Sequence, residues 1–166
     1  MTDIKLKKTV LTVMFISLST VGAMIKIPAF IGSIALDSLP ALIAAVMLGP
    51  VAGGITAAMG HILSSLLAGF PLGMFHVLIS LEMFLLVMLF GYLYRKVKVI
   101  SFVVMLIGNA FVAPLPFYFL INPSFYYTLL TPLLVGTVIN LVGAYILIRK
   151  ASPILSRYVE SGEVKG

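Results

Sequence analysis

Long apolar runs alternate along the chain with short breaks of Gly, Pro and charged residues, and this pattern predicts membrane helices. The charged residues leave two wide gaps: 44 residues separate Asp37 from Glu82, and 50 residues separate Lys98 from Arg149. Because one crossing needs about 20 apolar residues, each gap holds two helices. The whole pattern predicts six helices, at about residues 9–25, 39–48, 51–68, 74–94, 99–120 and 127–148.

The breaks place the ends of these helices. A residue that precedes proline disfavours the helical conformation, so the second helix ends at Gly49-Pro50, and we expect the fifth to bend at Pro114 and Pro116. Residues 27–38 have the composition of an outer loop that partly enters the membrane.

The first apolar run has an alternative interpretation as a cleavable signal peptide that ends near Val21-Gly22-Ala23. We favour a permanent helix, because the run is long enough to cross the membrane when tilted. Residues 149–166 then form an amphipathic tail outside the bilayer.

The composition agrees with a chain that lies mostly in lipid. Hydrophobic residues make up 61% of the sequence and charged residues 10%, so we expect a single membrane domain over residues 1–166, with no soluble catalytic module. The fold class that follows is an all-α integral membrane protein. The absence of cysteine excludes disulfides, thiol nucleophiles and thiolate metal sites.

The net charge of +6 would suggest a nucleic-acid partner in a soluble protein, but here it has a simpler origin. Ten of the eleven Lys and Arg residues lie in the amino-terminal segment, in the 95–98 loop and after residue 148, with Lys26 as the exception. Six helices place these three regions on one side, which the positive-inside rule identifies as the cytoplasm. We therefore expect both termini in the cytoplasm, the first loop outside, and no nucleic-acid partner.

A few polar residues interrupt the apolar runs. An ionisable side chain that faces lipid costs about 3 kcal/mol, so such residues face other helices or a water-filled cavity. At about 1.5 Å per residue, His61 and Glu82 both lie in the outer half of the membrane, and His76 lies nearer the surface. We interpret these residues as a candidate ligand site, and list its members as Glu82, His61, His76, Asn109, and Asp37 and Lys26 from the first outer loop.

Structural roles remain open for the same residues. Glu82 and His61 could join helices, His76 could lie at the membrane surface, and Lys26 could extend its amine to the lipid headgroups. Asn109 and Asn140 are both interpreted mainly as hydrogen-bonding residues between helices.

Nothing in the sequence indicates an enzyme. There is no HExxH, GxSxG or phosphate-binding loop, and the six-residue spacing of His76 and Glu82, about 240° around a helix, predicts different helix faces. We expect no catalytic residue, no metal site and no bound cofactor, and we favour a small-ligand pocket. A structural or assembly protein and an intramembrane enzyme are the alternatives.

The stretch IALDSLPALIAAVMLGPVAGGITAAMGHILSSLLAGFPLG contains a D-x-x-P opening and an L-G-P-x-x-G hairpin. This stretch resembles the second and third helices of the substrate-binding S components of energy-coupling factor (ECF) transporters. The six short helices predicted for the whole chain are similar to the same family. The resemblance implies a bacterial cell-membrane protein that captures a vitamin or vitamin precursor from outside, with the first loop as a lid. It also implies a transmembrane coupling subunit and two ATPase subunits as partners, which hydrolyse the ATP.

The resemblance also implies a docking surface for the coupling subunit on the first helix. Members of the family carry an Ala-x-x-x-Ala pair there, for which the nearest match in this chain is Ser19 and Ala23.

The charges around the candidate site suggest the kind of ligand. Glu82 and Asp37 are acids, Lys26 is the single base, and no Arg lies in the outer half of the membrane. This balance suits a neutral or weakly basic nitrogen heterocycle with hydroxyls, such as the cobalamin precursor α-ribazole. An anionic vitamin such as pantothenate fits less well, since it would favour an arginine fork.

Overall fold

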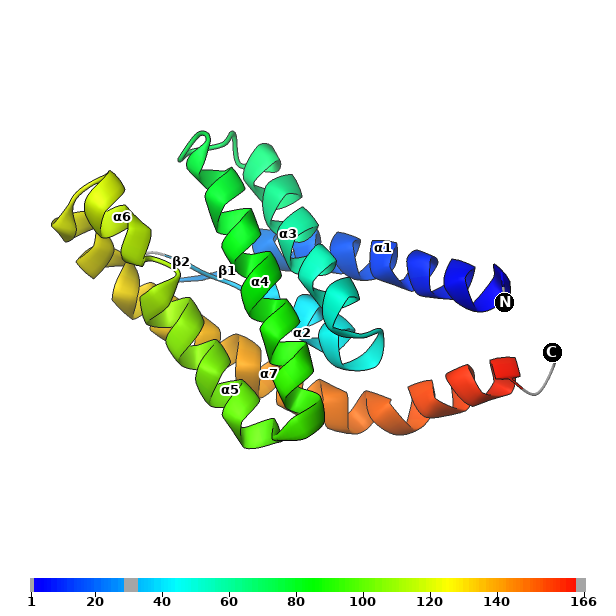
Figure 1. The fold of residues 1–166 in the computed structure, drawn as a ribbon. Helices are drawn as coiled ribbons and strands as arrows, with labels where there is room; N and C mark the ends of the chain where they lie inside the picture. Colours follow the sequence, from blue (N-terminus) through cyan, green and yellow to red (C-terminus); the bar gives the residue numbers. More distant parts are fainter. Residues whose placement is uncertain (1, 29–32, 164–166) are drawn as a thin grey trace.

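The computed structural model describes residues 2–28 and 33–163, and the side chains of residues 4–25 and 36–150. It is a bundle of helices with one small hairpin (Figure 1). The elements are α1 (Thr2–Met24), β1 (Lys26–Pro28), β2 (Ser33–Ala35), α2 (Ser38–Met47), α3 (Pro50–Leu67), α4 (Phe75–Lys96), α5 (Lys98–Ile107), the π-helical turn η1 (Gly108–Val112), α6 (Leu115–Leu120) and α7 (Pro123–Glu163).

The prediction of an all-α membrane bundle is confirmed. With α5, η1 and α6 taken as one interrupted helix, the described residues form six helical segments. Five of these segments are long and apolar enough to cross a membrane, and α2 is the short one. Large apolar side chains such as Leu81 and Val99 point outward, where lipid would cover them.

Four elements differ from the sequence-based expectation, and the first of them is α1, which begins at Thr2 rather than near residue 9. The segment expected to be a loop contains an antiparallel hairpin in which Lys26 pairs with Ala35, while residues 29–32 lie outside the described part. The fifth helix is interrupted by η1, where the Ala113 N–H donates to the Gly108 carbonyl five residues earlier, at 2.8 Å. The last helix continues to Glu163, so the tail expected after residue 148 is helical as far as that residue.

The short helix α2 lies at the centre of the bundle, in contact with α1, α3, α4 and α7. Its small residues allow this close approach: Ala41, Ala44 and Ala45 are fully buried, as is Leu42. A side-chain carbon added at Gly53 of α3 would collide with Ala45. The core therefore depends on small residues that let helix backbones meet, as is usual in membrane bundles.

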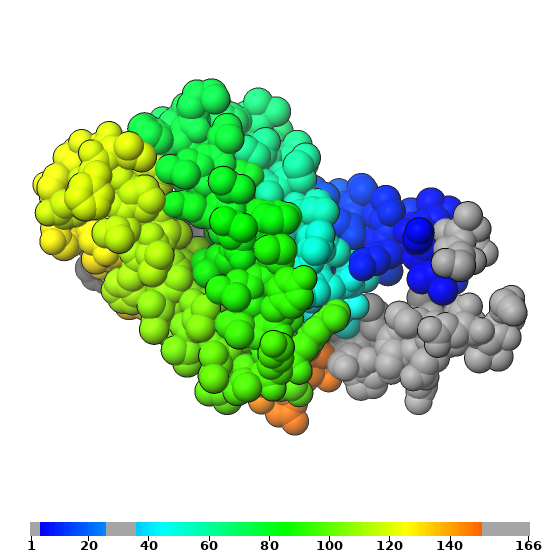
Figure 2. Space-filling model, viewed as in Figure 1, coloured from blue at the N-terminus to red at the C-terminus, as the bar shows by residue number. Residues whose placement is uncertain are grey.

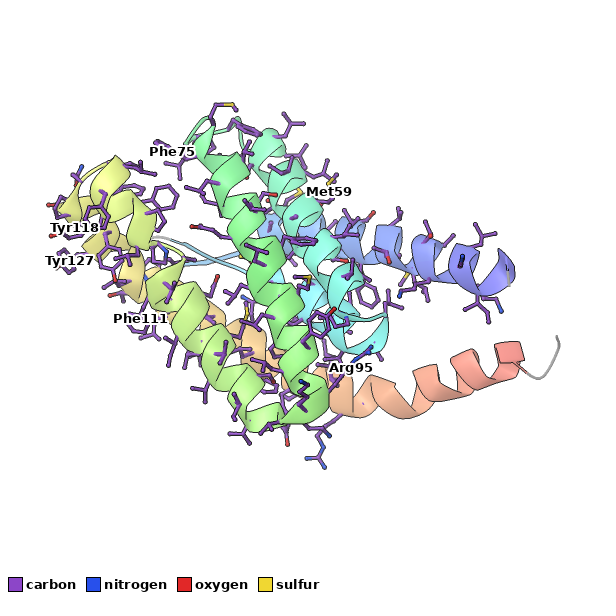
Figure 3. All side chains as sticks on the ribbon, viewed as in Figure 1. Met59, Phe75, Arg95, Phe111, Tyr118 and Tyr127 are labelled. Atoms are coloured by element: carbon purple, nitrogen blue, oxygen red, sulfur yellow. The ribbon has the colours of Figure 1, made fainter. Side chains whose placement is uncertain are left out.

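The turn between α2 and α3 lies at one end of the bundle. Gly49 has φ of +111°, which only glycine adopts readily, and the charged groups of Arg95 and Lys8 both lie close to it. Arg95 lies in the last turn of α4, beside the turn between α2 and α3, whereas Tyr118 and Tyr127 lie at the opposite end of the bundle (Figure 3). Basic groups from α1 and α4 thus meet at one end.

Helices α4 and α5 lie side by side on the face drawn in Figure 2, and α1 projects from the bundle beside them. In Figure 1 the start of α1 and the end of α7 lie on the same side of the bundle.

Candidate ligand-binding site

A cavity of about 240 Å³ lies between α2, α3, α4 and the η1–α7 segment. Most of its wall is apolar, with Ile79, Met83 and Phe117 among its residues. Five of the six residues predicted for the ligand site also line it: Asp37, His61, His76, Glu82 and Asn109. The structure therefore brings together polar residues that the sequence places on four separate segments.

Glu82 lies in the middle of α4 and is half-buried. Its Oε2 is the single buried side-chain polar atom without a hydrogen-bond partner among the described residues. Buried polar atoms in proteins are nearly always paired, so an unpaired carboxylate oxygen in a cavity wall calls for an explanation.

His76 and Glu82 line the same cavity, although their six-residue spacing places them on different faces of α4. An angle of 240° around a helix is 120° in the other direction, and Ile79 occupies the position between them. The cavity wall includes all three residues, because it covers a broad face of α4 rather than a single row.

The two histidines contact each other directly. His61 Nε2 lies 3.1 Å from His76 Nδ1, and the ring centroids are 5.2 Å apart. The Ser65 hydroxyl lies 3.0 Å from the same His76 Nδ1, and the Leu72 N–H donates to His76 Nε2 at 3.2 Å. His76 is buried, with 6% of its surface exposed, so it is part of the protein interior rather than of the membrane surface.

Asp37 and Asn109 also line the cavity, from two segments that are distant in the chain. Asp37 precedes α2, and burial raises the pKa of its carboxyl, while a hydrogen bond from the Ser38 hydroxyl partly opposes that shift. Asn109 lies in η1, and its Nδ2 donates to the Thr137 Oγ1 at 2.7 Å. Single π-helical turns are frequent at functional sites, and this one places Asn109 in the wall.

Asn140 has the structural role expected of it. Its Oδ1 accepts the Leu39 N–H at 2.8 Å, and its Nδ2 donates to the Gly136 carbonyl at 2.8 Å. This side chain joins α7 to the first turn of α2, and it is absent from the cavity wall.

The remaining predicted residues lie away from the cavity or outside the description. Lys26 begins β1, and its side chain lies outside the described residues. Ser19 is 1% exposed, and its hydroxyl donates to the Asp37 carbonyl at 2.6 Å. Ser19 packs against Gly60 of α3, so its side chain is not open to a partner in this structure, contrary to the docking expectation. Ala23 is half-buried.

Sequence reasoning missed Ser65 and Leu72, which hold His76 through the contacts above. Ser65 could have been found, because it follows His61 by four residues, the spacing of neighbours on one helix face. The Leu72 contact comes from a turn, which helical periodicity does not describe.

In a comparison with protein families, the chain matches the family described as the substrate-specific component of ECF transporters, over residues 7–154. The match covers most of the chain. The chain belongs to this family. Comparison with curated proteins and with solved structures found no match.

Membership of the family agrees with the five described helices that can cross a membrane. The S component is a multi-pass membrane protein and the substrate-binding part of a transporter. Its family is one of transporter components, not of enzymes. Membership also implies a small-molecule substrate and association with ECF coupling and ATPase modules.

Proposed function

We propose that the S component captures a vitamin or vitamin precursor from outside the cell in the cavity that Glu82 lines. The observation that carries this proposal is the Glu82 Oε2, a buried acceptor without a partner among the described residues, in a mostly apolar wall. An unpaired buried acceptor costs roughly 1–3 kcal/mol. A ligand N–H or O–H that bonds to this oxygen would remove the cost.

The ligand that we propose is a neutral or weakly basic nitrogen heterocycle with hydroxyls, such as α-ribazole. Glu82 and Asp37 bring two acids to the wall, and no Lys or Arg is among the described side chains that line it. A carboxylate such as pantothenate would add a third acid with no guanidinium to receive it.

The size of the cavity agrees with a small ligand. Its volume, about 240 Å³, lies just under the range of roughly 300–1,000 Å³ that is usual for ligand pockets. This volume favours one heterocycle with a small polar substituent over a large cofactor.

For transport, we propose the arrangement that membership of the family suggests. The S component binds a transmembrane coupling subunit and two ATPases, which hydrolyse ATP, and itself holds no cofactor. The hairpin between α1 and α2 acts as the lid over the cavity. The whole protein then topples in the membrane to release its ligand inside the cell. The hairpin lies directly before Asp37 of the cavity wall, which supports the lid role.

The orientation in the bacterial cell membrane is also a proposal: both termini are cytoplasmic and the hairpin is outside. The gathering of Lys8 and Arg95 at the α2–α3 turn supports it, because basic residues favour the cytoplasmic side.

Mass spectrometry of small molecules that co-purify with the detergent-solubilised protein tests the binding function directly. We expect one nitrogen heterocycle, in an amount close to that of the protein. If nothing co-purifies and neither α-ribazole nor related heterocycles bind, a structural or assembly role becomes the better interpretation.

The role of Glu82 is tested by Glu82→Gln, which removes the charge and keeps the shape. We expect at least about tenfold weaker binding of the co-purified compound by calorimetry, or roughly 1.4 kcal/mol, because a charged acceptor becomes a neutral amide. Glu160→Gln, the same change in the distal part of α7, is the matched control and should bind normally. Unchanged affinity in Glu82→Gln would show that Glu82 only joins helices.

A further inference from the structure

The hydrogen bonds around His76 determine which of its ring nitrogens carries a proton. His76 Nε2 faces the Leu72 backbone N–H at 3.2 Å, so this nitrogen accepts a hydrogen bond and carries no hydrogen. A neutral imidazole has one N–H, which must then be on Nδ1. A doubly protonated ring would set its Nε2–H against the Leu72 N–H.

The contact between the two rings also determines which nitrogen of His61 carries a hydrogen. The Ser65 hydroxyl donates its one hydrogen to the His61 carbonyl at 2.7 Å, so its oxygen accepts from His76 Nδ1–H at 3.0 Å. His76 Nδ1–H also reaches His61 Nε2 at 3.1 Å, which must therefore accept. In a neutral His61 ring the remaining hydrogen lies on Nδ1, for which no partner is found among the described residues.

We propose that His76 is a positioning residue that fixes His61 as a one-hydrogen donor, so that the site selects a ligand with an acceptor atom for His61 Nδ1–H and a donor for Glu82. This inference rests on the proposed function of the cavity, which both residues line. The acceptor is an unprotonated ring nitrogen, a carbonyl oxygen or a hydroxyl oxygen. A ligand that presents only N–H or cationic groups to His61 is rejected, because two hydrogens would face each other.

The turn between α3 and α4 holds His76 in this orientation. The rings of Phe70 and His76 pack in a T-shaped arrangement, with centroids 5.2 Å apart and planes at 72°. Phe70 has φ of 54°, a conformation that non-glycine residues seldom adopt, and its N–H donates to the Ser65 carbonyl at 2.8 Å. The ring is thus fixed from the turn side by Phe70 and Leu72, independently of any ligand.

The test that decides the tautomers needs no ligand. The chain contains two histidines, so ¹⁵N-histidine labelling gives NMR spectra with signals from two imidazole rings. A variant that lacks His61 and a variant that lacks His76 assign each signal to its ring. In the ligand-free protein we expect both rings neutral with the hydrogen on Nδ1. A hydrogen on Nε2 of either ring would overturn the proposal, whatever the protein binds.

Two substitutions at His76 separate the positioning role from simple packing. In His76→Asn the side-chain amide nitrogen can replace Nδ1 as the donor to His61, whereas in His76→Gln the amide reaches the place of Nε2 and leaves Nδ1 unreplaced. We expect His61 to keep its Nδ1–H form in His76→Asn and to become a mixture of tautomers in His76→Gln. The same spectrum for His61 in both variants would contradict the positioning role.

Calorimetry with α-ribazole as the probe extends the test to binding. We expect His76→Gln to bind the probe at least about fivefold more weakly than His76→Asn. In His76→Gln a part of the His61 rings has no hydrogen on Nδ1 and cannot donate to the ligand. Equal dissociation constants for the wild-type chain and both variants would refute the selection of an acceptor. Failure of the wild-type chain to bind the probe would count against the ligand proposed above, while the ligand-free NMR spectrum would still decide the tautomers.

Discussion

Replacing Gly60 by alanine tests the contact through which α1 packs against α3. A β-carbon at this position would lie 2.7 Å from the Ser19 Cβ and closer still to its Oγ, whereas carbon atoms prefer roughly 3.5–4.0 Å. Either α1 moves away or Ser19 rotates. In both cases the hydroxyl loses its 2.6 Å hydrogen bond to the Asp37 carbonyl, at the edge of the cavity.

Three contributions set the size of the effect on the free energy of unfolding. Overpacking costs about 1–3 kcal/mol, and the lost hydrogen bond costs about 0.5–1.5 kcal/mol. Alanine is the better helix former and returns about 1 kcal/mol. The net destabilisation of Gly60→Ala is therefore roughly 0.5–3.5 kcal/mol, which corresponds to a fall in melting temperature on the order of 1–14 °C for a chain of this length.

Thermal unfolding in detergent, followed by circular dichroism or by an aggregation assay, measures this fall. Met59→Leu is the control, because Met59 lies next to Gly60 in the chain on the exposed surface of α3 (Figure 3), and we expect a change within about 0.5 kcal/mol. The double variant Gly60→Ala with Ser19→Gly removes the two colliding atoms, Ser19 Oγ and Cβ. Its loss of stability should therefore be smaller than the sum of the losses in the two single variants, by at least about 1 kcal/mol. Additive effects, or no loss of stability in Gly60→Ala, would refute the α1–α3 contact.

Two further predictions concern the membrane. Because the chain has no cysteine, single cysteines at Ser33 and Lys96 can be labelled in intact cells, and we expect them to react from opposite faces; reaction of both from one face contradicts the proposed topology. Since Ser19 is buried, the docking proposal now depends on Ala23, and Ala23→Leu should block assembly with the coupling subunit and uptake while the solitary protein still binds its ligand. Normal uptake by this variant would remove Ala23 from the docking surface.

Much of the site could be predicted from the sequence, for a physical reason. Lipid cannot solvate ionisable side chains, so His61 and Glu82 had to face the protein interior wherever the helices met. The lengths of the apolar runs and the Gly and Pro breaks likewise determined the number of helices and the short α2, since each is a property of one segment.

The tertiary structure decided how these segments are rotated against one another. Ser19 has the small-residue spacing of a docking surface, yet it faces Gly60 and Asp37, because the rotation of α1 depends on contacts with residues distant in the chain. The bonds of His76 to His61 and Leu72 arise in the same way, from two helices and a turn. Periodicity within one helix determines which residues share a face, but only packing between helices determines what that face meets.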